Sequence, residues 1–125
     1  MKSFNKQTGF IGEDLATEAL KKKDYQILER NFSNKFGEID IIAKDKTRSA
    51  SSGQDILVFV EVKTKKGEEF GSPEEMINTK KLWKIRNMAN LYMNRNDLPC
   101  RIDVVAIVLS PTDEVLRLTH YENVY

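Results

Sequence analysis

The chain has almost no residues that form disulfides or bind soft metals: its 125 residues include one cysteine, Cys100, and one histidine, His120. A lone cysteine excludes an internal disulfide and is typical of a reducing compartment, so we expect a cytoplasmic protein. We expect Cys100 to be half-buried, and His120 to pack or cap, since no second ligand stands at zinc-site spacing. A metal site in this chain would be built from oxygen ligands.

Long apolar runs and an excess of one charge are also lacking. No segment approaches the roughly 20 apolar residues of a membrane span, and residues 1–10 contain no run typical of a signal peptide. The net charge is +1, so any nucleic-acid binding must come from local clusters of basic residues. A chain of 125 residues, 40% apolar and 31% charged, predicts one globular domain over residues 1–125.

Two short runs, 36–43 and 56–63, carry charges in otherwise apolar segments. Both are rich in β-branched and aromatic residues, so both are predicted to be strands. Residues 57–60 are continuously apolar, which indicates a strand covered on both faces, near the middle of a sheet. Side chains alternate between faces, so Glu38 and Asp40 share one face, as Glu61 and Lys63 share one face of the other strand.

Buried carboxylates need compensation, because an unpaired one costs several kcal/mol. A hairpin between the two strands would bring the carboxylates together if Asp40 paired opposite Glu61, and we predict that register or a bulge that produces it. From the residues alone, a divalent-cation site and a structural cluster of salt bridges remain equally open.

The rest of the chain predicts an α+β (α/β) fold with a mixed sheet and helices packed on it. Ser72 to Glu75 resembles a capping box with proline at the first helical position. Asp103 is interpreted as the partner of Arg101. The expected elements are a helix over 8–22, a strand over 25–32, the two strands above joined by a flexible loop at about 44–55, a helix from 72 to about 95, and strands over 102–109 and 115–119.

The second helix is basic on one side, with Lys80, Lys81 and Lys84 and no acid over residues 76–96. Contact with a polyanion and simple solvation are about equally favoured for such a face. Lys65 and Lys66, just after Lys63, could supply a second group of DNA contacts.

The carboxylates suggest a particular chemistry. Asp40 or Glu38, with Glu61 and the backbone carbonyl of Val62, could ligate Mg²⁺ and leave positions for water and a phosphate oxygen. The ammonium of Lys63 would lie in the same site, where it could orient an attacking water and offset developing charge. Phosphodiester hydrolysis requires these parts and no protein nucleophile.

A family resemblance bears on this choice. The segments that carry it are Gly12-Glu13-Asp14-Leu15-Ala16, Arg30-Asn31, Gly37-Glu38-Ile39-Asp40-Ile41-Ile42-Ala43, Phe59-Val60-Glu61-Val62-Lys63, Arg101-Ile102-Asp103-Val104-Val105-Ala106 and His120-Tyr121-Glu122-Asn123. In these segments the chain resembles the YraN-like family, a group of small predicted endonucleases in the PD-(D/E)XK superfamily that is similar to archaeal Holliday-junction resolvases.

The resemblance implies a restriction-endonuclease-like three-layer core with a five-stranded mixed sheet in the order α-β-β-β-α-β-β. It implies Asp40 and Glu61 as ligands of Mg²⁺, which Mn²⁺ could replace, and Lys63 as the catalytic lysine. Glu13, which the residues alone predict to be a solvated helix carboxylate, becomes a candidate additional catalytic residue and ligand, and Glu38 a further possible ligand.

Two positions depart from the family pattern. Ile39 stands before Asp40 in place of the proline that names the superfamily, and Lys65 stands where similar sequences often have arginine, which removes a bidentate phosphate contact. We therefore expect a metal-dependent endonuclease acting on DNA, with branched DNA as a candidate substrate and a homodimer as a possible state. The alternative is a catalytically weak or inactive nuclease-fold module that binds DNA or a partner protein.

Overall fold

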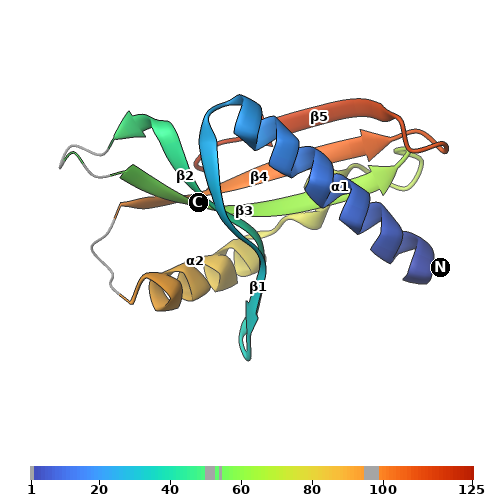
Figure 1. Cartoon of the computed structure of the whole chain (residues 1–125). Helices are drawn as coiled ribbons and strands as arrows, with labels where there is room; N and C mark the ends of the chain where they lie inside the picture. The colour runs from blue at the N-terminus through green and yellow to red at the C-terminus, as the bar shows by residue number, and fades with distance from the viewer. Residues whose placement is uncertain (1, 50–52, 54, 95–98) are drawn as a thin grey trace.

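The computed structural model describes residues 2–49, 53, 55–94 and 99–125. Its sheet has the strand order β1-β2-β3-β4-β5, in which only β3 and β4 run parallel (Figure 1). The predicted order of helices and strands is confirmed, with one short 3-10 helix added. The elements are α1 (Lys2–Lys22), β1 (Tyr25–Asn34), β2 (Gly37–Ser49), β3 (Asp55–Lys66), the 3-10 helix η1 (Pro73–Met76), α2 (Thr79–Met93), β4 (Cys100–Leu109) and β5 (Val115–Tyr121).

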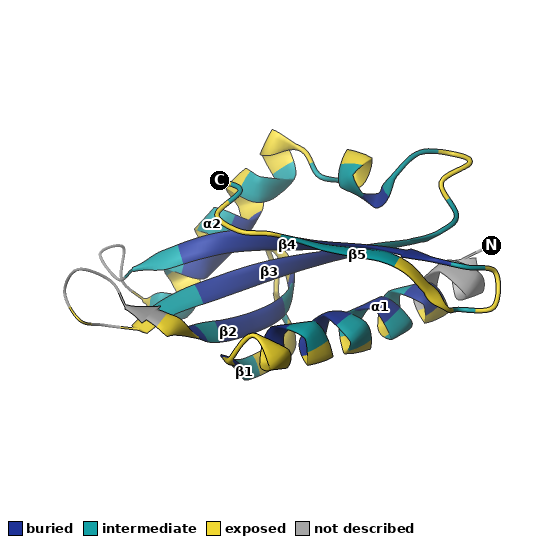
Figure 2. Ribbon diagram, turned by 90° about the horizontal axis from the view of Figure 1, so that it is seen from above, coloured by how far each residue is buried: buried dark blue, intermediate teal, exposed yellow. Residues whose placement is uncertain are grey.

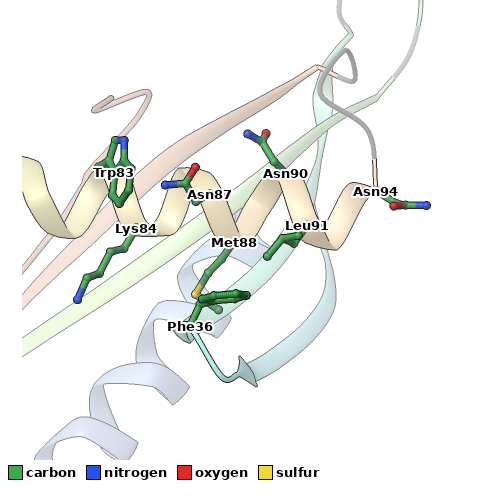
Figure 3. Close-up of a pocket in the computed structure, with 8 residues that line it drawn as sticks. All are labelled: Phe36, Trp83, Lys84, Asn87, Met88, Asn90, Leu91 and Asn94. Atoms are coloured by element: carbon green, nitrogen blue, oxygen red, sulfur yellow. The ribbon is translucent and has the colours of Figure 1, made fainter.

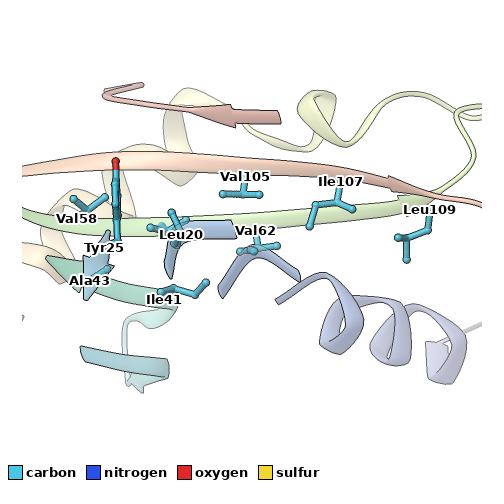
Figure 4. Packing of buried hydrophobic residues seen from close by; sticks show 11 residues of the cluster. Leu20, Tyr25, Ile41, Ala43, Val58, Val62, Val105, Ile107 and Leu109 are labelled. Carbon is cyan, nitrogen blue, oxygen red and sulfur yellow. The ribbon is translucent and has the colours of Figure 1, made fainter. Parts of the chain in front are cut away.

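The two helices cover opposite faces of the sheet, which gives three layers (Figure 2). Alternation along β3 assigns its side chains to the two faces. Val58, Val60 and Val62 join Leu20 of α1 in one core cluster (Figure 4). Phe59 joins the other cluster, which contains the buried α2 residues Ile85, Met88 and Ala89. The predicted central position of residues 57–60 is confirmed, because Val58, Phe59 and Val60 are fully buried.

Two strands extend further than predicted. β1 continues to Asn34, with Asn31 at a positive φ of 55° inside the strand rather than at its end. β2 continues to Ser49 and β3 starts at Asp55, so residues 44–49 of the expected flexible loop at 44–55 are strand, with an irregularity in the pairing between Asp45 and Ser49. The reason is Asp45, which is buried and accepts hydrogen bonds from Thr47 and Arg101. Residues 50–52 and 54 of that loop lie outside the described residues.

The predicted capping box at Ser72 is wrong. Pro73 starts only the single turn of η1, and the Ser72 side chain makes no capping hydrogen bond. α2 begins later, at Thr79, where the Asn78 side chain accepts a hydrogen bond of 2.8 Å from the backbone N of Lys81. The helix ends at Met93, with Asn94 in the left-handed conformation. Arg95, where the helix was expected to end, lies outside the described residues.

A buried polar network spans the α1 side of the sheet around Arg101. Its guanidinium donates to Asp103 and to Asp45, each at 2.9 Å, and also contacts the hydroxyl of Tyr25. Nε2 of His120 lies 2.7 Å from Asp103, so His120 packs into this network, as predicted. Burial alone would raise the pKa of Asp45, but hydrogen bonds from Thr47 and Arg101 hold it at about 2. The predicted Arg101–Asp103 pair is confirmed.

Among the helices that the structure describes, none is long and apolar enough to cross a membrane.

Removing the Arg101 side chain should destabilise the protein strongly. Arg101→Ala leaves the carboxylates of Asp45 and Asp103 buried without their cation, which should lower the free energy of unfolding by about 3–5 kcal/mol in urea titrations. Lys21→Ala, which breaks an exposed ion pair with Glu18, is the control and should have little effect. Equal small losses in both variants would contradict a structural role for the network.

Candidate active site

The pairing of β2 with β3 brings two carboxylates together. Ile41 pairs with Val60 and Ile42 with Phe59, and the next step of this register sets Asp40 opposite Glu61. The backbone pairing of the two strands ends at Ile41. Beyond it, the side chain of Asp40 takes over, and its Oδ2 accepts a hydrogen bond of 2.8 Å from the backbone N of Val62. Both side chains face the α2 layer. The predicted register is confirmed.

Two lysines from different elements converge on Glu61. Lys63 Nζ lies 3.4 Å from Glu61 Oε1, and Lys81 Nζ of α2 lies 3.7 Å from the same atom. The Glu61 side chain is only 6% exposed, so its charge depends on these neighbours rather than on water. Sequence reasoning assigned Lys81 to DNA contact and missed this role. The sequence feature that could have revealed this role is Asn78, a residue type that often caps helices. It stands three residues before Lys81 and so places Lys81 in the first turn of α2.

The electrostatics of the cluster are unbalanced. Burial and the adjacent charge of Asp40 raise the pKa of Glu61 to about 7, against the lowering effects of Lys63 and Lys81. Burial tends to lower the pKa of Lys63, but its hydrogen bond with Lys81 and the charges of Glu61 and Asp40 outweigh it, so the pKa is raised. The pKa of Lys81 is lowered by burial and by Lys63. The two lysines therefore do not fully offset the cost of burying the ionised Glu61 carboxylate beside Asp40.

These side chains open into a cavity of about 490 Å³, which we call the carboxylate–lysine cavity. The exposed Glu38 is on its rim, together with Lys80 and Lys84 from α2. The structure thus brings together seven of the predicted site residues, Lys81 among them. The cavity is lined by Phe36, Gly37, Glu38, Asp40, Glu61, Lys63, Asn78, Lys80, Lys81, Lys84, Ile85 and Met88.

Glu13 approaches the cluster from α1. A side chain at position 12 would collide with the Thr64 hydroxyl, so Gly12 allows α1 to lie close against β3. Burial and the charge of Asp40 raise the pKa of Glu13. Its Oε1 is buried without a hydrogen-bond partner among the described residues, and its cationic neighbour, Arg30 Nη2, is 3.8 Å away. Glu13 is therefore not the solvated carboxylate that the residues alone predicted.

Lys65 and Lys66 lie elsewhere. They line a separate cavity of about 450 Å³ next to Thr8 and Phe70. Lys65 Nζ donates to the carbonyl of Phe70 at 3.2 Å, and Lys66 forms an ion pair of 2.8 Å with Asp113. The two predicted groups of DNA-contacting lysines thus line different cavities.

The donor set suits a hard divalent cation. Asp40, Glu61 and the backbone carbonyl of Val62 offer only oxygen, and Mg²⁺ is often held by one or two carboxylates with water and substrate oxygens completing its shell. The pKa of Glu61 is raised chiefly by burial and further by the charge of Asp40, and a bound cation would favour the ionised carboxylate. Among the residues that the structure describes, no three Asp, Glu, His or Cys side chains are grouped closely enough to hold a metal by themselves.

The fold and this cluster define the class: an α+β protein with paired carboxylates and a lysine on neighbouring central strands of a mixed sheet. The family model described as "Uncharacterised protein family UPF0102" matches residues 12–107, and the chain belongs to this family.

Relatives match over nearly the whole chain. A "UPF0102 protein" of Dictyoglomus turgidum is 39% identical over 124 residues, covering 97% of this chain and 98% of the relative. One from Clostridium kluyveri is 42% identical over 118 residues, covering 92% and 90%. One from the Loch Maree strain of Clostridium botulinum is 44% identical over 110 residues, covering 85% and 83%.

The raised pKa of Glu61 predicts an unusual pH dependence of stability. Folding raises this pKa from 4.5 to about 7, so the folded state binds more protons than the unfolded state between these values. Without metal, the free energy of unfolding should fall as pH rises from about 5 to 8, by on the order of 2 kcal/mol. Urea titrations in EDTA should show this fall, and Glu61→Gln should abolish it.

Glu69→Gln, which changes an exposed loop carboxylate, is the matched control and should retain the wild-type pH dependence. If the free energy of unfolding of Glu61→Gln depended on pH as that of the wild type does, the raised pKa of Glu61 would be contradicted.

Proposed function

We propose that this protein is a metal-dependent endonuclease that hydrolyses phosphodiester bonds of DNA. The observation that carries the proposal is the convergence of Asp40, Glu61 and Lys63 on one cavity bordered by further lysines. The resemblance of the Gly37–Ala43 and Phe59–Lys63 segments to the PD-(D/E)XK superfamily supports it independently of the geometry.

The carboxylates of Asp40 and Glu61 and the carbonyl of Val62 would hold Mg²⁺, or Mn²⁺ in its place. The raised pKa of Glu13, and its buried Oε1 without a hydrogen-bond partner among the described residues, support a further role for it beside them, directly or through water. A bound ion would acidify a water molecule and polarise the phosphate. The pKa of Glu61, about 7, means that the site gains its full negative charge only above neutral pH.

The lysines would act on the substrate. Lys63 is held against Glu61 with its side chain 18% exposed, so its ammonium can both orient a water molecule in the cavity and meet charge that develops on the phosphate. Without a ligand, Lys81 pairs with Glu61. Its ammonium lines the same cavity, so it could exchange Glu61 for a phosphate oxygen of a bound strand.

The basic side of α2 would receive the DNA backbone. Lys80, Lys81 and Lys84 face the carboxylate–lysine cavity, and no acid on α2 opposes them. With a net charge of +1, affinity would depend on this local group rather than on the whole surface. The likeness to resolvases favours branched DNA, and a two-fold dimer would suit such a substrate.

One observation favours the alternative, a binding module without catalysis. Lys63 and Lys81 both lie within 4 Å of Glu61, as in a self-neutralised structural cluster. A module of this kind would bind DNA through the lysines with or without a divalent cation.

Cleavage assays separate the two. Labelled single-stranded, duplex, flap and four-way-junction DNAs are incubated with Mg²⁺, Mn²⁺ or EDTA. We expect metal-dependent cutting by the wild type and a loss of at least about a hundredfold in both Asp40→Asn and Lys63→Ala. The first removes a carboxylate that would hold the metal, and the second removes the ammonium that would orient water and meet developing charge.

Asp24→Asn, at the turn after α1, is the matched control for Asp40→Asn and should cut like the wild type. Cutting that survives in both site variants would contradict the proposal. Metal-independent binding of these DNAs without any cutting would favour the binding module.

A further inference from the structure

A second hollow adjoins the carboxylate–lysine cavity, along the side of α2 that faces away from the sheet (Figure 3). Its volume is about 730 Å³. We call it the α2 groove and define it by Phe36, Trp83, Asn87, Asn90, Leu91 and Asn94. All but Phe36 come from α2 and its C-terminal cap, and Phe36 comes from the turn between β1 and β2.

Large apolar side chains are exposed in the α2 groove. Trp83 is 57% exposed, Phe36 58% and Leu91 56%. Ile85, Met88 and Ala89 already supply the buried stripe that attaches α2 to the sheet, so the fold does not require the exposed side chains. Exposed aromatic rings that serve no packing role are typical of binding surfaces.

The polar residues of the groove are uncharged amides. Asn87, Asn90 and Asn94 follow Trp83 at helical spacing, so they form one row along the groove. Within the described part of the chain, the buried Oδ1 of Asn90 has no hydrogen-bond partner. An amide offers both donors and acceptors, which suits the edge of a nucleobase.

The two hollows share a wall. Phe36, Lys84 and Met88 line both the α2 groove and the carboxylate–lysine cavity. A strand whose phosphate reaches Asp40 and Glu61 would pass Lys84 before its next base meets the rings of the groove. No acid of α2 would repel its backbone. Rings for stacking next to cations for phosphate are the combination that binds single-stranded nucleic acid.

We infer that the α2 groove holds an unpaired base of a nucleic-acid strand, stacked on Trp83 and Phe36, while the adjoining phosphate lies in the carboxylate–lysine cavity. The inference rests on the proposed function and specifies its substrate class: strands with unpaired bases beside the cleavage point, rather than continuous duplex. A second copy of the chain, or an apolar segment of another protein, is the competing occupant.

The only tryptophan of the chain lies in the groove, so its fluorescence reports binding directly. The full-length protein is titrated in EDTA, at constant salt, with a single-stranded oligonucleotide, an abasic strand of the same length and charge, and a blunt duplex. We expect the single strand to quench Trp83 strongly, and the abasic strand and the duplex to leave its emission nearly unchanged.

Variants locate the effect. Phe36→Ala should weaken single-strand binding about fivefold or more, and Trp83→Ala should do the same when labelled DNA is followed by anisotropy. Phe10→Ala is the matched control, because Phe10 on α1 is similarly exposed, at 54%, and lies outside the groove. All three residues are exposed, so thermal melting should show intact folds.

Several outcomes would overturn the inference. These are equal quenching by the abasic strand or the duplex, no binding of any strand, or equal weakening by Phe10→Ala and Phe36→Ala. Another is a change in Trp83 emission that depends on protein concentration and not on DNA. If Phe36→Ala abolished both this change and dimerisation, the groove would be an interface between copies.

Failure of the proposed function is distinguishable, because these titrations contain no metal and require no turnover. Base-dependent quenching in a protein that cuts none of the DNAs would support the groove and reject the nuclease. Cutting of continuous duplex without quenching would support the nuclease and reject the groove.

Discussion

Asp40 and Glu61 are held side by side by the backbone register of β2 and β3, and much of the surrounding structure follows from that constraint. Two adjacent carboxylates on buried strands repel each other and have lost most of their hydration. Lys63 on the same strand and Lys81 from the first turn of α2 reduce this cost. The position of α2, fixed by its cap at Asn78, therefore brings Lys81 to Glu61 as well as covering one face of the sheet.

Among the residues that the structure describes, two buried charged clusters differ chemically. Around Arg101, each carboxylate meets a guanidinium and further donors, and the pKa of Asp45 is held at about 2. Around Glu61, burial and Asp40 outweigh two lysines, and the pKa rises to about 7. The first cluster has the charge balance expected of a structural element. The second keeps a buried carboxylate with a strongly raised pKa facing a cavity, which is typical of a functional site.

Much of this arrangement could be predicted from the sequence because it depends on alternation along strands. The apolar run at 57–60 indicated a central strand, and the shared face of Glu61 and Lys63 follows from a period of two. The register that pairs Asp40 with Glu61 followed from requiring the charges to meet. What could not be predicted depends on contacts between distant segments. The buried Asp45 near the end of β2 is held by Arg101 from β4, and Lys81 reaches the site because α2 starts at Thr79, after its cap Asn78, instead of at Ser72.

The most direct test of the account is a crystal structure of the protein grown with Mn²⁺, in which anomalous scattering locates the ion. The account predicts a Mn²⁺ ion bound by the carboxylates of Asp40 and Glu61 and by the carbonyl of Val62, with the Lys81 ammonium moved away from Glu61. The ion should be missing from the same position in Asp40→Asn. Wild-type crystals in which Lys63 and Lys81 still pair with Glu61, and in which Mn²⁺ is bound elsewhere or not at all, would contradict it.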